Sequence, residues 1–408
     1  MDNDPTSRKQ VLFVDDEPEV IDGLRDALRR YRRDWDMRFV TGGEEALGAL
    51  AALPADVIVT DVQMPGMDGA ELLTRVQALH PSTIRLVLSG YANTQLVARA
   101  ATVAHRILAK PCNVEELALM VQRSCALHEL TEHTGLFRIA AAATTLPSRP
   151  GLYTQITRAV ADPRSGPDDI ARIIERDAAM TAKLLQIANS AFFGIGRTVT
   201  RVRDAVVYLG ADTIKALTLS AEAFTSLAPG EIDGLSIDAL QRHSTLVARL
   251  AASMLPDGPI QQDAVTAALV HDIGHLILIS DDAARWRRLV AQAHSRGVPL
   301  HAIEQEELGS SHAAVGAYLL SLWGLPDGVV EAVANHHQPS AVPGPALDAV
   351  AVVHIADALA HEVQSELSPG PQPALLDEDL VDRLAIRDEL QQWRELAGAA
   401  GGTEGADR

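Results

Sequence analysis

Hydrophobic and polar positions follow two different patterns along this chain. In the first 128 residues, short apolar runs alternate with amphipathic stretches in which apolar residues recur every three or four positions, as at Leu72, Val76 and Leu79. Buried strands separated by helices predict a five-stranded, doubly wound parallel sheet of the flavodoxin-like α/β type. The strands are expected around the apolar runs Val11–Val14, Arg38–Val40, Val57–Val59, Leu86–Leu88 and Arg106–Leu108.

After residue 128 the pattern changes. Residues 129–145 are rich in Ala and Thr and predict a helical linker. From residue 146 to residue 361 strand signals are almost absent, so an all-α domain is expected, followed by an extension over 362–408 whose Gly-rich end, Gly398–Arg408, is expected to be disordered. The helices are expected at Asp168–Ser190, Val202–Leu227, Ile237–Met254, Gln262–Ile279, Ala284–Ser295, Leu300–Glu307, Ser311–Trp323 and Val329–His336.

Composition narrows the classes of function. The 408 residues are 47% hydrophobic and 22% charged, which is ordinary for a globular protein, and the net charge of −19 disfavours binding to nucleic acid or anionic membranes. Only two cysteines are present, Cys112 and Cys125, which fits a reducing compartment. The N-terminal segment is polar, and no run of 18 apolar residues occurs, so we expect a cytoplasmic protein.

Polar side chains follow the predicted strands of the first domain. Asp15 and Asp16 come after the first strand, Asp61 ends the third, Ser89 ends the fourth and Lys110 follows the fifth. Carboxylates that converge at one edge of a sheet repel one another unless a hard cation such as Mg²⁺ lies between them. With Mg²⁺ bound, Asp61 can act as a nucleophile toward a phosphoryl group, and Lys110 and Ser89 can contact its oxygens. The alternative is that each aspartate only caps a helix.

These residues resemble the receiver domain of two-component response regulators over roughly residues 10–125. The motifs are Val14–Glu17, Asp61–Gly69, Ser89–Tyr91 and Lys110-Pro111. The resemblance implies that a sensor histidine kinase phosphorylates Asp61, and that Ser89 and Lys110 contact the phosphoryl group. It also implies that Asp15, Asp16 and Asp61, with the carbonyl of Gln63, hold Mg²⁺. The family often has an aromatic residue at the position of Ile107, so coupling by rotation of that aromatic ring is not expected here.

Histidines are concentrated in the second half of the chain. A His next to an Asp supplies two ligands from one helix end, and neutral imidazole with carboxylate suits Fe, Mn, Ni or Zn. His294, His301 and His361 are interpreted as ordinary surface or core residues, and Asp272 has the alternative role of a helix cap. The candidate metal ligands are His243, His271, Asp272, His312, His336, His337 and Asp357.

The order of His243, His271-Asp272 and Asp357 is similar to that of the metal ligands in the HD superfamily of phosphohydrolases. The HDOD branch of that superfamily is the better match, over about residues 146–361, on the motifs Leu146-Pro147, Asp177–Leu185, Ala188–Gly194, Leu209-Gly210 and His312–His337. HDOD domains commonly act as helical output modules in bacterial signalling, with eroded metal ligands and without a settled enzymatic activity. The resemblance therefore implies an HD-like helical domain controlled by the receiver.

Two functions follow from these resemblances. The favoured one is a response regulator whose HDOD domain acts by contact with a downstream signalling protein. The alternative is a receiver-regulated metal phosphohydrolase, with a cyclic dinucleotide as a candidate substrate. Against hydrolysis, His275 stands where catalytic relatives usually carry Lys, and Gln338-Pro339 follows His336-His337 in place of a Gly-Tyr-Pro motif. A DNA-binding output is disfavoured because the chain lacks a basic recognition helix, and the sequence leaves homodimer formation open.

Overall fold

The computed structural model describes residues 8–89, 94–110, 114–122 without 116 and 119, 139–140, 152–162, 164–189, 198–220, 237–341, 347–363 and 376–403. Apart from residues 139 and 140, the expected linker at 129–145 lies outside the described residues. The same holds for Gly90-Tyr91, Pro111, Leu146-Pro147, Ser190–Gly194 and both cysteines.

The N-terminal domain is built on a five-stranded parallel sheet with the order β2-β1-β3-β4-β5. This confirms the predicted fold class, and each apolar run lies within a strand. Because β1 is flanked by β2 and β3, the strand order reverses at β1, and the crevice beyond its carboxyl end is where the candidate residues collect. The strands are β1 (Lys9–Val14), β2 (Trp35–Val40), β3 (Val57–Asp61), β4 (Ile84–Ser89) and β5 (Arg106–Ala109).

Helices follow the strands in alternation. α3 begins where the side chain of Asp68 accepts a hydrogen bond from the backbone N–H of Glu71, and its apolar face, with Leu72 and Val76, is buried. α2, α3 and α4 pack side by side in chain order. Helical elements of this domain include α1 (Pro18–Ala27), the 3₁₀ turn η2 (Leu28–Tyr31), α2 (Gly43–Ala52), α3 (Gly69–Leu79) and α4 (Thr94–Val103).

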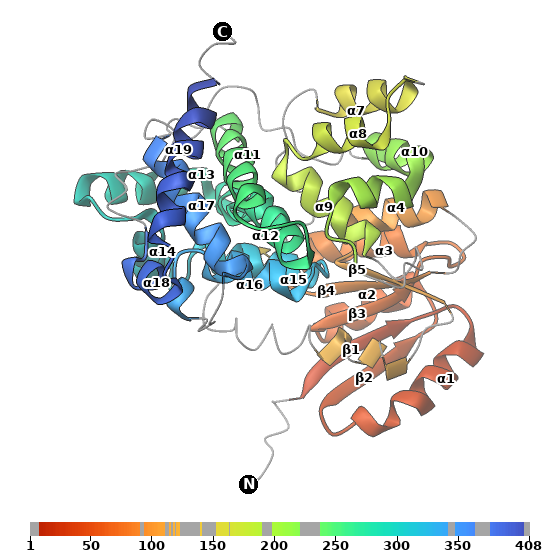
Figure 1. Ribbon diagram of the computed structural model, residues 1–408. Helices are drawn as coiled ribbons and strands as arrows, with labels where there is room; N and C mark the ends of the chain where they lie inside the picture. The colour runs from red at the N-terminus through yellow and green to blue at the C-terminus, as the bar shows by residue number, and fades with distance from the viewer. Residues whose placement is uncertain are drawn as a thin grey trace.

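The described part of the second domain is helical, which confirms the all-α prediction. α11, α12, α16 and α17 pack against one another, and α15 lies between α13 and α16. A second group, α7 to α10, lies next to α4 of the first domain (Figure 1). The helices are α7 (Leu152–Ala161), α8 (Pro167–Ile174), α9 (Ala178–Ala188), α10 (Val202–Ser220), α11 (Ile237–Met254), α12 (Pro259–Val270), α13 (Ile273–Arg296), α14 (Leu300–Leu308), α15 (His312–Leu322), α16 (Asp327–Asn335) and α17 (Ala349–Val363), with a 3₁₀ turn η5 (Pro339–Ala341).

Two predicted helices are each interrupted by an aspartate. The stretch Asp168–Ser190 divides into α8 and α9 because the Asp177 side chain accepts a hydrogen bond from Met180 N and starts a new helix. The stretch Gln262–Ile279 breaks after α12, where Asp272 leaves helical geometry with φ −95° and ψ 12°. Periodicity carries through both breaks because apolar residues continue on the same face on each side.

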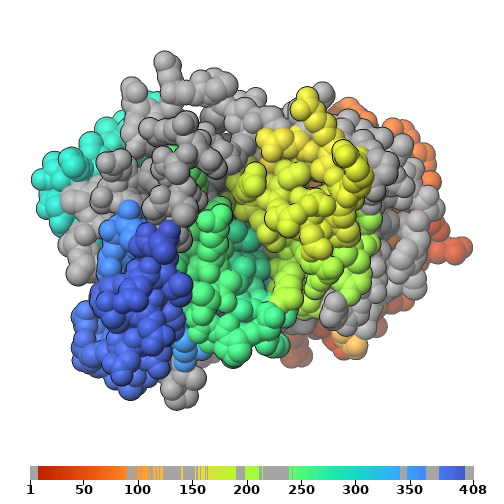
Figure 2. All heavy atoms as spheres, turned by 45° about the horizontal axis from the view of Figure 1, so that its top comes forward, coloured from red at the N-terminus to blue at the C-terminus, as the bar shows by residue number. Residues whose placement is uncertain are grey.

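The C-terminal extension forms α18 (Glu378–Leu384) and α19 (Arg387–Thr403). α19 packs against α11 and α17, and Figure 2 shows it in dark blue beside the green α11. The expectation of disorder from Gly398 onward is wrong up to Thr403, because the helix continues through the glycines after burying Leu390, Trp393 and Ala397. The stretch Pro259–Arg296 is long and apolar enough to cross a membrane. However, 83% of its most apolar 18-residue segment is buried inside the protein, as in a core helix.

Candidate phosphorylation and metal sites

Three of the predicted receiver residues meet at the carboxyl end of the sheet. Lys110 directly follows β5, and its Nζ lies 2.6 Å from Asp15 Oδ2 and 2.9 Å from Asp61 Oδ2. Both carboxylates are buried, and Asp15 Oδ1 also accepts a hydrogen bond from the backbone N–H of Glu17. The sequence-predicted convergence of these side chains is therefore present in the structure.

The other three predicted residues surround this contact. Ser89 is buried at the end of β4, and its carbonyl accepts a 2.7 Å hydrogen bond from Lys110 N. Gln63 is exposed, and its backbone N–H donates to the Asp61 carboxylate. Asp16 is half-buried beside Asp15.

Charge at this site is balanced by Lys110. Burial by itself lowers the pKa of Lys110, but its hydrogen bonds to Asp15 and Asp61 outweigh burial and raise the pKa above its ordinary value. The ammonium therefore stays charged and shields two carboxylates from each other. The same oxygens are the hard donors that Mg²⁺ prefers, so the residues fit that ion.

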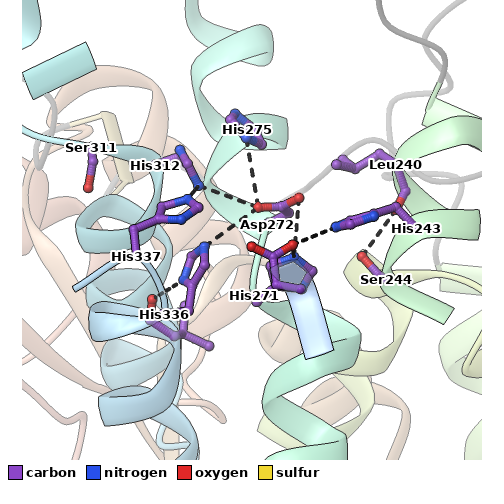
Figure 3. Close-up of polar contacts among 12 residues, drawn as sticks. Leu240, His243, Ser244, His271, Asp272, His275, Ser311, His312, His336 and His337 are labelled. Atoms are coloured by element: carbon purple, nitrogen blue, oxygen red, sulfur yellow. Dashed lines mark hydrogen bonds and ion pairs between the residues drawn. The ribbon is translucent and has the colours of Figure 1, made fainter. Parts of the chain in front are cut away.

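The predicted metal ligands of the helical domain converge on a second site (Figure 3). Seven histidines and two aspartates form overlapping groups in which the ligand atoms lie within 4.8 Å of one another. His271 and Asp272 occupy the break between α12 and α13, and this break lets two consecutive side chains face the same centre. The members are His243, His271, Asp272, His275, His312, His336, His337, Asp357 and His361.

The orientation of three imidazoles is fixed from outside the centre. Nδ1 of His271 donates to Ala268 O at 2.8 Å, and Nδ1 of His336 donates to Val333 O at 2.7 Å. Nδ1 of His312 donates to the Glu304 carboxylate at 2.6 Å. Each ring therefore turns its Nε2 toward Asp272, and within the part of the chain that the structure describes, the buried Nε2 of His336 has no hydrogen-bond partner. Metal-ligating histidines are typically held in this way, through the nitrogen that does not bind the metal.

Asp272 lies between two groups of imidazoles: His271 is near one of its carboxylate oxygens, and His312 and His336 are near the other. Its Oδ2 is 3.3 Å from His271 Nε2, and its Oδ1 is 3.4 Å from His312 Nε2 and 3.9 Å from His336 Nε2. Metal bonds of about 2.1 Å at right angles place neighbouring ligand atoms about 3 Å apart, so these separations suit a bound ion.

Asp357, on α17, contacts the histidines on the His271 side of Asp272. Its Oδ1 lies 2.8 Å from His243 Nε2 and 3.7 Å from His271 Nε2. On the other side of Asp272, His312 Nε2 lies 3.0 Å from His337 Nε2. The four residues of the HD order, His243, His271-Asp272 and Asp357, thus share one centre with the additional candidates His312, His336 and His337.

Burial and charge set the protonation of the centre. Burial, together with the neighbouring His271 and His312, lowers the pKa of His336 to about 3, so its Nε2 carries a free lone pair. Burial also opposes the charged form of His312, but Glu304 and Asp272 outweigh it and raise the pKa of His312 to about 10. Burial likewise opposes the charged form of His271, but Asp272 and Asp357 outweigh it and raise the pKa of His271 well above its ordinary value. Without a metal, positive charge is therefore held at His271 and His312, beside the buried carboxylates.

Four further residues belong to the centre or its support, and only local spacing could have indicated them. His361 is one helical turn after Asp357, with Nε2 3.2 Å from Asp357 Oδ1. Glu304 occupies the apolar face of α14 with Leu300 and Ile303. His275, one turn after Asp272, stacks on His312, and His301 stacks on His337. His361 thus lies within the centre and His301 beside it, although the sequence indicates ordinary surface or core residues at both positions, whereas His294 is exposed.

Comparison with protein families agrees with both halves of this description. Residues 11–122 match the family model of the response regulator receiver domain, and residues 146–339 match that of the HDOD domain. The chain therefore combines a receiver domain with an HDOD domain, as the sequence motifs indicated.

Similar proteins extend over part of this chain. An uncharacterized protein of Treponema pallidum is 25% identical over 199 residues, which are 49% of this chain and 39% of that protein. The uncharacterized transcriptional regulatory protein YesN of Bacillus subtilis is 32% identical over 116 residues, 26% of this chain and 30% of that protein. The chain thus spans less than half the length of these curated relatives.

Among solved structures, the MmoQ response regulator of Methylococcus capsulatus covers 61% of this chain and 98% of its own, with 21% identity and a TM-score of 0.48. The signal receiver domain of an HD domain-containing protein of Pseudomonas fluorescens covers 31% of this chain and 99% of its own, with 29% identity and a TM-score of 0.29.

Proposed function

We propose that this chain, which joins a response regulator receiver domain to an HDOD domain, is phosphorylated on Asp61 and thereby controls a divalent metal centre in its HDOD domain. A receiver domain implies a histidine kinase as the phosphoryl source. Asp15, Asp16, Asp61 and the Gln63 carbonyl would hold Mg²⁺, which neutralises charge on the transferred phosphoryl group when bound. Lys110 and Ser89 would contact that group from the ends of β5 and β4.

The metal centre rests on one observation. The Nε2 atoms of His271 and His336 are buried and face Asp272, and both rings are anchored through Nδ1. Among the described residues, Nε2 of the neutral His336 has no hydrogen-bond partner, and an unpaired buried acceptor costs about 1 to 3 kcal/mol, so this atom requires a compensating ligand. The donor set is imidazole and carboxylate, which suits Fe, Mn, Ni or Zn. His243, His271, Asp272 and Asp357 would hold one ion, and His312, His336 and His337 would hold a second that shares Asp272.

The favoured output is contact with a downstream signalling protein. A phosphodiesterase needs a cation that reaches the scissile phosphate, and His275 stands where relatives that cleave cyclic dinucleotides usually carry Lys. The His275 side chain is only 5% exposed, stacked on His312 and packed edge-on against Trp286. It is therefore poorly placed to touch a substrate. Hydrolysis of a cyclic dinucleotide is the second candidate, favoured by the full set of His and Asp ligands.

Elemental analysis tests the proposal. Protein purified without chelators is expected to carry stoichiometric Fe, Mn, Ni or Zn, and His271→Ala and Asp272→Ala are expected to lose it while remaining folded. His294→Ala, which changes an exposed histidine of α13, is the matched control and should keep the metal. Absence of metal from the parent protein, even after reconstitution with each ion, would contradict the centre. Turnover of a phosphodiester by the loaded protein, lost in both variants, would establish the second candidate instead of the first.

A further inference from the structure

The two domains are joined at the start of β5. The Arg106 guanidinium donates from Nη2 to Ser321 O at 3.1 Å and from Nε to Leu322 O at 3.2 Å. Both carbonyls belong to the last turn of α15, where the continuing helix supplies no further i+4 backbone donors; Ser321 O also accepts a hydrogen bond from the backbone N–H of Gly324 at 3.0 Å. A cation at this position also complements the negative end of the helix dipole. Arg106 is therefore a specific cap for α15, supplied by the receiver domain.

The turn after α15 is shaped for this contact. Gly324 has φ +79°, and a Cβ at this position would lie 2.9 Å from atoms of the Arg106 guanidinium. Next to it, Gln186 of α9 donates to Ala104 O at 3.1 Å and to His105 O at 2.7 Å, just before β5 begins. The amino end of β5 is thus fixed to the HDOD domain by side chains from both partners.

The opposite end of β5 belongs to the phosphorylation site. Lys110 follows Ala109 directly, and its ammonium bridges Asp15 and Asp61. Lys110 lies four positions after Arg106, a span of about 13 Å at the usual rise of a strand. A phosphoryl group on Asp61 adds negative charge at the position to which Lys110 already points. Movement of Lys110 toward that charge acts on the strand that carries Arg106.

The opposite end of α15 belongs to the metal centre. His312 is the first residue of α15, and its Nε2 faces Asp272. The start of α15 is locked to the start of α13, because a Cβ on Gly274 would lie 1.9 Å from His312 O. One end of α15 is therefore held by Arg106, and the other packs closely on α13 two residues after Asp272, so a displacement of α15 at Arg106 would be transmitted to the contact between His312 and Asp272.

We infer that β5 and α15, joined by Arg106, couple the phosphorylation site to the metal centre. This inference rests on the proposed metal centre and specifies its regulation: phosphorylation of Asp61 changes the metal affinity at His312 through the end of α15. Arg106 touches neither ligand and acts as a positioning residue. Because binding couplings are reciprocal, metal loading must change the affinity of the receiver for a phosphoryl analogue by the same factor.

The experiment measures Co²⁺ affinity from its visible absorption in full-length protein, with the receiver site saturated by Mg²⁺ and with or without beryllofluoride. In the parent protein we expect beryllofluoride to change the Co²⁺ dissociation constant by at least about fivefold. Arg106→Ala should bind Co²⁺ alone and beryllofluoride alone as the parent does. The factor by which beryllofluoride changes the Co²⁺ dissociation constant should, however, fall to about one in this variant. Asp61→Asn should remove the beryllofluoride effect, and Arg75→Ala, on the exposed side of α3, should leave the factor unchanged.

Two further variants keep the coupling testable if Arg106→Ala does not fold. Gln186→Leu removes different hydrogen bonds of the same interface, and Arg106→Lys keeps the charge without the two-carbonyl contact; both should reduce the factor. The coupling would be overturned if beryllofluoride left the Co²⁺ dissociation constant of the parent unchanged. It would also be overturned if beryllofluoride had the same effect in both Arg106→Ala and Gln186→Leu as in the parent. Failure of Co²⁺ to bind at all would instead overturn the metal centre, so the two failures are distinguishable.

Discussion

The Glu304 carboxylate accepts two hydrogen bonds from His312, one from the backbone N–H at 2.8 Å and one from ring Nδ1 at 2.6 Å. The first fixes the beginning of α15, and the second fixes the ring orientation in which Nε2 faces Asp272. Burial opposes the ionised form of Glu304, but His312 outweighs it and lowers the pKa of Glu304 below its ordinary value. One buried carboxylate thus determines both the position and the basicity of a candidate metal ligand.

Glu304→Gln is therefore expected to weaken metal binding without unfolding the domain. The amide oxygen still accepts a hydrogen bond from His312, but the loss of charge makes the imidazole a poorer ligand. Mutation of a residue that hydrogen-bonds to a metal ligand typically lowers metal affinity by about 10- to 100-fold. Competition with a chromophoric chelator measures the change. Glu307→Gln, at an exposed position of the same helix, is the control. Equal affinities in the two variants would show that Glu304 only holds α15 in place.

Much of this arrangement could be predicted from the sequence. The apolar runs predict the five strands, and since parallel strands end at one edge, the meeting of Asp15, Asp61 and Lys110 follows from their positions. In the helical domain, adjacent His271 and Asp272 indicate a centre, but periodicity predicts an uninterrupted helix there. The break becomes evident only in three dimensions, where Gly274 meets the start of α15.

Other features depend on contacts between distant segments. Glu304 on an apolar helix face is a local signal of a buried carboxylate, but nothing in the neighbouring sequence indicates that it supports His312. Arg106 lies at the edge of an apolar run and is indistinguishable from a solvent-exposed strand terminus until α15 is placed against it. Pairings across more than 200 residues of chain cannot be derived from local periodicity.

Lys110→Met is expected to separate Mg²⁺ binding from phosphoryl transfer. Its ammonium occupies the same carboxylates that would hold Mg²⁺, and removing a cation about 4 Å from the ion relieves about 1 kcal/mol or more, so Mg²⁺ should bind about fivefold tighter or better. Labelling of Asp61 by acetyl phosphate should fall on the order of 10²-fold, because a donor to the transferred group is lost. Calorimetry and phosphate-affinity gels measure the two effects.

The control for this variant is Lys9→Met, at the opposite end of β1 from Asp15, which should alter neither quantity. Weaker Mg²⁺ binding in Lys110→Met would mean that the lysine orders the two carboxylates rather than competing with the ion.

Lys183→Met is expected to stabilise the protein in a pH-dependent way. Burial, with a further contribution from Arg85, lowers the pKa of Lys183 from 10.5 to about 7, and its Nζ, above the Trp323 ring, has no hydrogen-bond partner among the described residues. At pH values between about 7 and 10.5, the unfolded chain binds more protons at this site than the folded protein does. Parent stability should therefore rise with pH across this interval by up to about 1.4 kcal/mol per unit, a contribution that the variant lacks.

Urea denaturation at pH 7.5, 8.5 and 9.5 checks this expectation. The advantage of Lys183→Met over the parent should be largest at the lowest pH and should shrink as the pH rises, while Lys9→Met should show no such trend. A constant difference at all three values would mean that Lys183 keeps its proton in the folded protein.

His361→Gln is expected to weaken the Asp357 side of the metal centre. His361 Nε2 lies 3.2 Å from Asp357 Oδ1, and its ring stacks on His243 with the centroids 4.4 Å apart, so it either binds the metal or orients a residue that does. Both roles predict a loss of about 10-fold or more in affinity, because the amide neither replaces an imidazole ligand nor stacks on His243. Metal content after dialysis against a weak chelator reports the loss, with His294→Gln as the exposed control. Metal retention equal to that of the control would place His361 outside the centre and leave Asp357 supported by His243 and His271 alone.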